Sequence, residues 1–93
     1  MHVGSLTVTL KVCDAVSLKE KRHVLKGVLE GARRRFNIAI AEVDHLDAHD
    51  TATLGVACVS NSSRHANSIL GHVLNHLEAN PEILVVDVHM EIF

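Results

Sequence analysis

The stretch at residues 17–36, SLKEKRHVLKGVLEGARRRF, decides the fold of this 93-residue chain. Ser17 and, three residues later, Glu20 form a capping box, in which each side chain can accept a hydrogen bond from a backbone N–H at the start of a helix. Apolar residues then recur at helical spacing and form one stripe: Leu18, Val24, Leu25, Val28, Leu29, Ala32 and Phe36. The stretch therefore predicts an amphipathic helix that packs against the rest of the molecule.

The other side of this predicted helix carries positive charge. Seven of the nine Lys and Arg residues lie within residues 17–36, which gives the segment a charge of +5 in a chain of net charge −2. Lys19, Lys21 and Arg22 occupy the first turn, where the helix dipole disfavours cations. We therefore expect the positive charge to serve a contact outside the helix, with a phosphate or an RNA backbone.

A helical wheel places Lys19, Arg22, Lys26 and Arg33 on one line, with His23 and Arg34 beside it, and Lys21 is added as a cation of the first turn. The candidate nucleic-acid-binding residues are therefore Lys19, Lys21, Arg22, Lys26, Arg33 and Arg34. The alternative is a solvated face with no ligand, in which Glu30 pairs with Lys26 and Arg34.

Four further segments of the chain precede the second helix. Residues 3–12 alternate strictly between apolar and polar side chains, as a strand with one buried face does. Residues 38–43 predict a short strand and residues 44–51 a polar connection. Residues 52–60 are apolar on both faces, which predicts a central strand.

The last third of the chain predicts one more helix and one more strand. The run SNSS at 60–63 offers several helix N-caps, and Asn80-Pro81 ends the helix. The apolar positions of this helix are Ala66, Ile69, Leu70, Val73, Leu74 and Leu77. The final strand alternates over residues 84–92, and its predicted buried side is Leu84, Val86, Val88, Met90 and Ile92.

The order of strand, helix, strand, strand, helix, strand predicts an α+β, ferredoxin-like βαββαβ domain over residues 1–93. Its four-stranded antiparallel sheet carries two helices on one face and leaves the other face open. Polar side chains of the first and last strands are expected on the open face: Ser5, Thr7, Thr9, Lys11, Asp87, His89 and Glu91. This face is a candidate surface for a homodimer or another partner.

Five segments of the chain carry a further signal: SLKEKRHVLK at 17–26, RFNIAIAEV at 35–43, ATLGVACVSN at 52–61, SRHAN at 63–67 and VDVHMEIF at 86–93. Together they resemble the YlxP-like family, a small bacterial family of unknown function. The resemblance covers nearly the whole chain and implies a ferredoxin-like fold. It also implies a gene neighbourhood shared with translation initiation and ribosome-maturation factors, including ribosome-binding factor A. Members usually carry a tryptophan in the loop where this chain has DAHDT, which removes the side chain that a stacking role would need.

No metal, other cofactor or enzymatic activity is expected. His72 and His76 have the spacing of a two-His metal site, but their helix offers no third ligand on that line. The Asp- and His-rich loop at 44–50 is of a kind that is more often simply solvated. Glycine-rich phosphate loops, nucleophile elbows and zinc-protease pairs are absent from the sequence.

The composition indicates a soluble cytoplasmic protein. No signal peptide opens the chain, and no apolar run approaches the length of a membrane span. Cys13 and Cys58 lie in apolar, strand-like runs, and we expect reduced core thiols, with a disulfide between them as the alternative.

The sequence therefore favours a non-enzymatic protein that binds ribosomal or other structured RNA through its phosphates. With two aromatic residues in the chain, stacking of single-stranded bases is not expected. The alternative is an interaction module that self-associates or docks onto another protein. Neither a membrane nor a small-molecule substrate is expected as a partner.

Overall fold

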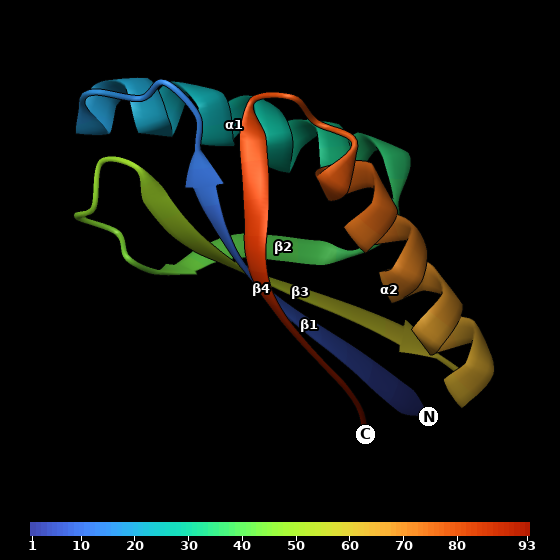
Figure 1. Ribbon diagram of the computed structural model, residues 1–93. Helices are drawn as coiled ribbons and strands as arrows, with labels where there is room; N and C mark the ends of the chain where they lie inside the picture. Colours follow the sequence, from blue (N-terminus) through green and yellow to red (C-terminus); the bar gives the residue numbers. More distant parts are fainter.

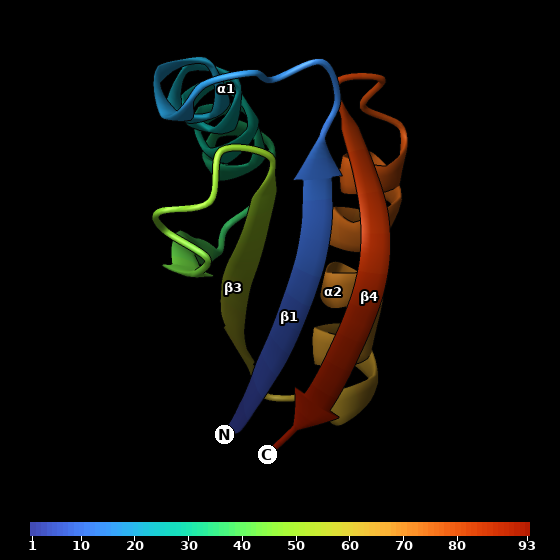
Figure 2. The ribbon, with the colours of Figure 1, turned by 60° about the vertical axis from the view of Figure 1, so that its left-hand side comes forward.

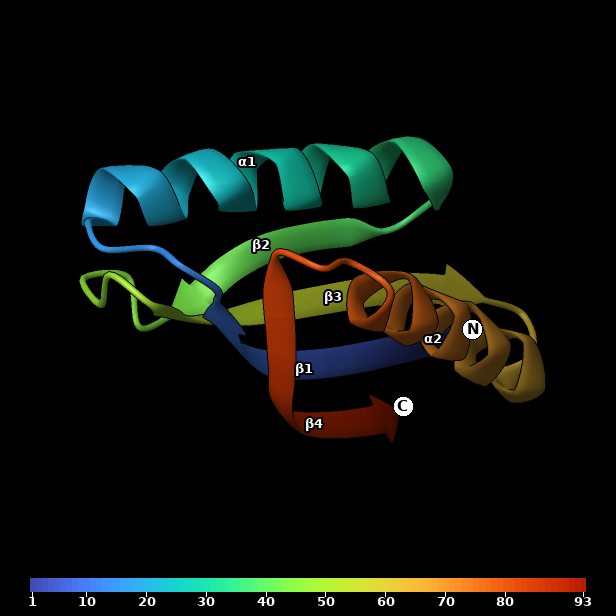
Figure 3. The same ribbon diagram turned by 45° about the horizontal axis from the view of Figure 1, so that its top comes forward.

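The strand β1 (His2–Val12) lies inside the sheet and pairs with a neighbour on each side. The computed structural model describes residues 1–93. The other elements follow in the order α1 (Leu18–Arg35), β2 (Ala39–Asp44), β3 (Thr51–Ser60), α2 (Ser63–Glu78) and β4 (Ile83–Ile92). All three strand pairings are antiparallel, in the order β2-β3-β1-β4, and both helices cover the same face (Figures 1 and 3). The predicted ferredoxin-like fold is confirmed.

The hydrophobic core lies between this face and the two helices. The inward row of β1 and the inward row of β3 are buried, as strict alternation requires. Helix α2 packs against β1, β3 and β4, whereas α1 packs against β2. The helices contribute seven buried apolar side chains: Leu25, Val28 and Ala32 from α1, and Ala66, Leu70, Val73 and Leu77 from α2. The predicted apolar stripes are therefore the faces that the helices bury. Neither helix is both long and apolar enough to cross a membrane.

The predicted register of β4 is wrong in its first half. The pairing with β1 shifts between Thr9, which lies opposite Asp87, and Leu10, which lies opposite Val85. Val86 is therefore an extra residue, and this β-bulge reverses the direction of the residues that precede it. Ile83 and Val85 consequently pack on the core, whereas Leu84 and Val86, predicted to be buried, are exposed.

The prediction of two core thiols is half right. Cys58 is buried on β3, but Cys13 is exposed in the turn that follows β1. Both are free thiols in the structure.

Candidate nucleic-acid interface

The start of α1 is fixed by two reciprocal hydrogen bonds. The Ser17 hydroxyl accepts from the Glu20 N–H at 3.2 Å, and the Glu20 carboxylate accepts from the Val16 N–H at 2.8 Å. The capping box therefore forms, with the Glu20 carboxylate reaching the residue before the N-cap. Glu20 is the acidic residue of the first turn of α1, where its negative charge complements the helix dipole.

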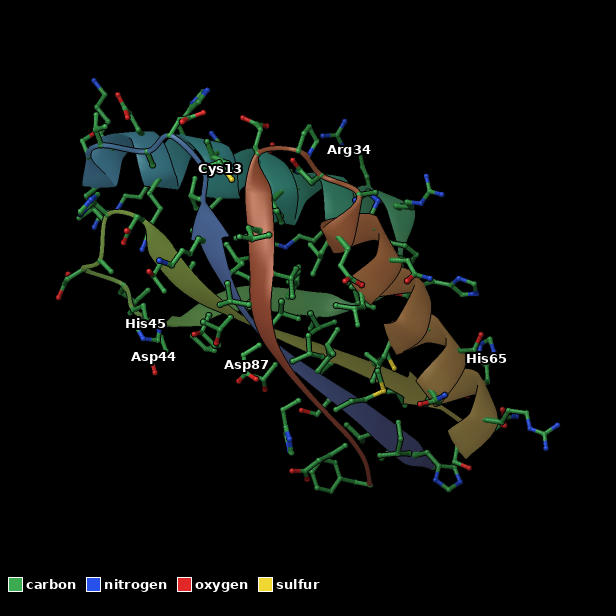
Figure 4. The ribbon with its side chains drawn as sticks, viewed as in Figure 1. Cys13, Arg34, Asp44, His45, His65 and Asp87 are labelled. Atoms are coloured by element: carbon green, nitrogen blue, oxygen red, sulfur yellow. The ribbon has the colours of Figure 1, made fainter.

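The outer side of α1 presents an exposed basic face made of five residues: Lys19, Arg22, Lys26, Arg33 and Arg34. From the first to the last they span roughly 22 Å of helix at 1.5 Å per residue. Figure 4 shows Arg34 on the side of α1 that points away from the sheet. Lys21 and Glu42 form an ion pair, whereas His89 and Glu91 share a hydrogen bond, which is an ion pair only when the imidazole is protonated. The pairs of Glu30 with Lys26 and Arg34, which belonged to the alternative of a solvated face, do not form, so no carboxylate neutralises the basic face.

Arg33 has a second role within this face. One of its guanidinium nitrogens donates to the Ile40 carbonyl oxygen at 2.8 Å, which ties the end of α1 to β2. The residue is exposed all the same, and a guanidinium has five N–H donors, so the others remain available to an anion.

Lys21 is not part of the basic face, and its prediction as a nucleic-acid-binding residue was wrong. Its side chain is fully buried (0% exposed). The ammonium donates to the carbonyl oxygens of His45, at 2.8 Å, and Thr51, at 3.0 Å. Its third contact is the Glu42 carboxylate, 2.9 Å away. Lys21 therefore holds the loop between β2 and β3 under α1 and has no charge to offer a ligand.

The contact between Lys21 and Glu42 is an ion pair rather than a well-directed hydrogen bond. Glu42 Oε2 lies within 2.9 Å of the ammonium, yet it has no hydrogen bond of acceptable geometry and is itself buried. The attraction between the two charges is thus mainly Coulombic, and the low-dielectric surroundings strengthen it. This pair binds α1 to β2 from inside the fold.

Helical geometry in the sequence already contained the signal for Lys21. Leu25, Val28 and Ala32 are the buried apolar residues of α1, and Lys21 precedes them by four, seven and eleven positions. Those spacings place all four residues on one line of an α-helix. The charge of Lys21 suggested the solvent side, but its position predicted the buried side.

The Asp- and His-rich loop is held by local hydrogen bonds. His45, which has a positive φ of 60°, places its ring nitrogen Nδ1 2.9 Å from the Thr53 hydroxyl. Thr53 in turn lies 3.0 Å from the Thr9 hydroxyl across the sheet. Asp44 accepts from the His45 N–H at 2.7 Å, and Figure 4 shows the two residues side by side. No group of three or more His, Cys, Asp or Glu side chains is close enough to share a metal ion.

The histidines of α2 have separate surroundings. The His76 ring meets the Phe36 ring edge-on, with 5.5 Å between ring centroids. His72 and His76 line a shallow hollow of about 460 Å³ between the ends of the two helices. His65 lies at the other end of α2, as Figure 4 shows.

The side chains on the open face of the sheet change from apolar on β2 and β3 to charged on β4. β2 and β3 present small side chains around a shallow hollow of about 330 Å³, lined by Ala39, Ala41, Val43, Gly55 and Ala57 among others. The hydroxyls of β1 follow, and then the charged residues of β4: Ser5 lies opposite Glu91, Thr7 opposite His89, and Thr9 opposite Asp87. The predicted positions of these polar residues are confirmed.

A family model described as "Protein of unknown function (DUF503)" matches residues 3–90. The chain belongs to this family. It is 39% identical to the uncharacterized protein YlxP of Bacillus subtilis (strain 168) over 72 residues, which make up 77% of this chain and 78% of that protein. The predicted resemblance to the YlxP-like family is thereby confirmed.

Among solved structures, a de novo designed protein with a ferredoxin fold matches with a TM-score of 0.61. The match covers 98% of this chain and 86% of the designed one, at 16% sequence identity. At that identity the likeness shows the fold alone.

Proposed function

We propose that this protein is a non-enzymatic RNA-binding protein of the cytoplasm, whose basic face on α1 contacts the phosphate backbone of ribosomal or other structured RNA. The observation that carries the proposal is the basic face itself. Five exposed cations share one side of one helix, and the carboxylates of an otherwise acidic chain lie outside ion-pair distance of them. Phosphate contacts from such a face release counterions from the RNA, which is the main source of sequence-independent affinity.

The positions of the cations along α1 strengthen this argument. Arg33 and Arg34 lie in the last turn of α1, where the helix dipole favours positive charge, so they also stabilise the helix. Lys19 and Arg22 lie near the first turn, where the dipole opposes them, and neither has a partner within the fold. A phosphate ligand outside the protein would account for their charge.

Shape and composition favour a duplex or a folded RNA over single-stranded bases. The sheet carries no aromatic ring of the kind on which RNA-recognition domains stack bases; the chain's two aromatic residues are Phe36 and Phe93. The major groove of an RNA duplex is too narrow for a helix, so α1 would lie across the backbone. Recognition would then depend on the shape and charge of the RNA.

A matched pair of double variants tests the proposal. Arg22→Gln/Lys26→Gln removes one Arg and one Lys from the basic face. Lys11→Gln/Arg64→Gln removes one Arg and one Lys from exposed positions outside residues 17–36, and changes the net charge equally. Affinity for a duplex RNA is measured by fluorescence anisotropy at low salt, together with co-sedimentation with ribosomes.

The first variant should lose roughly tenfold or more in affinity, because two phosphate contacts disappear, whereas the second should stay close to wild type. Circular dichroism should show that both variants are folded, since exposed substitutions shift stability by about 0.5 kcal/mol or less. Equal losses in the two variants would mean that only net charge matters, and unchanged binding in both would refute the proposal.

The open face of the sheet favours one alternative, which is an interaction module without a nucleic-acid role. Its small side chains around the hollow at Gly55 allow another protein surface to approach closely. This alternative predicts that RNA affinity is negligible in wild type and in both double variants.

A further inference from the structure

The two edges of the sheet are protected very differently. At one edge, β2 has six residues, α1 packs against it, and the Arg33 guanidinium binds the Ile40 carbonyl. At the other edge, β4 has ten residues, contains neither Lys nor Pro, and is the outermost strand (Figure 2). Exposed edges pair readily with other strands, and proteins usually block them. The bulge at Val86 blocks only the first part of β4, which leaves the regular part after it bare.

The hydrogen bonds at the end of β4 show which of its backbone groups are free. Val3 and Phe93 exchange both of their N–H···O bonds, at 3.1 and 2.8 Å. In an antiparallel ladder every second residue does so, which places the N–H and C=O of Glu91 and His89 toward β1 as well. The N–H and C=O groups of Val88, Met90 and Ile92 therefore point outward at the bare edge.

The side chains of these same three residues form an apolar row that the fold covers only in part. Met90 and Ile92 are half-buried against the core, and Val88 is 39% exposed although it lies on the helix side of the sheet. The fold therefore leaves part of each side chain exposed at this edge. A strand added along this edge would satisfy the free backbone groups and cover the row at the same time.

We propose that β4 pairs antiparallel with β4 of a second copy, about a twofold axis at Met90, and so joins two four-stranded sheets into one. An antiparallel strand pair is self-complementary, as a twofold interface requires. About Met90, Val88 of one copy faces Ile92 of the other, which closes the apolar row. The pairing uses only residues beyond the bulge.

Side-chain pairing across the axis selects this register. In the pairing about Met90, His89 of each copy faces Glu91 of the other, and these two side chains already form a hydrogen bond within one chain, with 2.6 Å between His89 Nε2 and Glu91 Oε1. A pairing about His89 would place Asp87 opposite Glu91, two carboxylates. A pairing about Val88 would run both strands through their bulges, where the ladder is interrupted. The basic face on α1 lies over the opposite edge of the sheet, so the dimer would form independently of RNA binding.

Sedimentation equilibrium of the wild-type protein over a wide concentration range tests this proposal. The expected result is a reversible monomer–dimer equilibrium. His89→Glu places two like-charge pairs across the axis and should weaken the dimer by roughly tenfold. His89→Glu/Glu91→Lys places opposite charges across the axis and should recover the dimer. A wild-type protein that stays monomeric throughout would overturn the proposal, and a double variant as weak as the single one would overturn the register.

Val88→Pro provides an independent test of the proposed strand pairing. Proline at this position removes an N–H that points away from β1 and places its ring in the path of the second copy, while the ladder with β1 keeps its bonds. The variant should be monomeric and should keep wild-type affinity for duplex RNA. A dimer that survives Val88→Pro would show that the contact lies elsewhere. Should Val88→Pro fail to fold, the charge-swap series still decides the question.

Discussion

Lys21 offers a sharp test of how this fold is held together, and Lys21→Met is the informative substitution. Methionine keeps the length of the apolar stem and removes the ammonium. The change would leave the Glu42 carboxylate, whose side chain is 16% exposed, without its partner. It would also strip the carbonyl oxygens of His45 and Thr51 of their shared donor.

The expected loss is about 3 kcal/mol in the free energy of unfolding. Breaking a buried ion pair by removing one partner costs roughly 3–5 kcal/mol. The lower end applies here, because Glu42 retains some access to water that can solvate its charge. A domain of this size has roughly 5–15 kcal/mol of stability in total, so the variant should unfold at clearly lower urea concentration.

Urea denaturation followed by circular dichroism measures this loss, and Lys19→Met is the matched control. Lys19 lies two residues away and is exposed, so the same change of charge and shape should cost less than about 0.5 kcal/mol. A second variant, Lys21→Met/Glu42→Leu, should recover part of the loss, since replacing a whole buried pair is far milder than breaking it. Equal unfolding midpoints for Lys21→Met and Lys19→Met would refute the assigned role of Lys21.

Three further predictions concern the core and the thiols. Leu25→Asp should prevent folding, because it buries an unpaired charge where the side chain is 3% exposed, and a native-like circular dichroism spectrum would contradict this. Gly4→Ala should destabilise the fold by about 1–3 kcal/mol, because the new methyl group would meet two side-chain atoms at 2.9 Å. Gly27→Ala, which has open space around the new methyl group, should stabilise α1 by up to about 1 kcal/mol. Urea denaturation of both variants checks the opposite signs. Cys13 should react with a thiol reagent in the native protein, and Cys58 should react only after unfolding. Mass spectrometry of the labelled protein measures this, and labelling of both residues in the native protein would contradict the prediction.

Periodicity in the sequence predicted the fold because both kinds of element bury one side. The alternation in residues 3–12 and the stripe that contains Leu25 and Val28 each have one geometric solution, and the structure buries those sides. The capping box at Ser17 predicted the first residue of α1 for a similarly local reason.

The register of β4 could not be predicted in the same way. In the run ILVV at 83–86 every side chain is apolar, so an inserted residue leaves no break in the pattern. The bulge is fixed by the pairing with β1, in which Leu10 selects Val85 and Thr9 selects Asp87. Such a choice between strands is a tertiary effect that the sequence of one strand does not reveal.

The candidate site was predictable in part. The basic face required only the wheel positions of exposed cations, and Lys19, Arg22 and Lys26 lie where the wheel put them. The prediction for Lys21 was wrong because a charged residue within an apolar line can face either solvent or a buried partner. Only the positions of Glu42 and the loop carbonyls decide between the two. Buried lysines are rare unless they are paired, and the partner here lies in a different element.

The central claim is that the basic face binds phosphates, and the salt dependence of RNA affinity tests it most directly. The affinity of wild type and of Lys19→Gln/Arg22→Gln/Lys26→Gln for one duplex RNA is measured over a series of salt concentrations. If each of the three cations neutralises one phosphate, the plot of log affinity against log salt should be less steep in the variant by roughly two to three units. Identical slopes for the two proteins would show that these cations only face solvent, and would contradict the account.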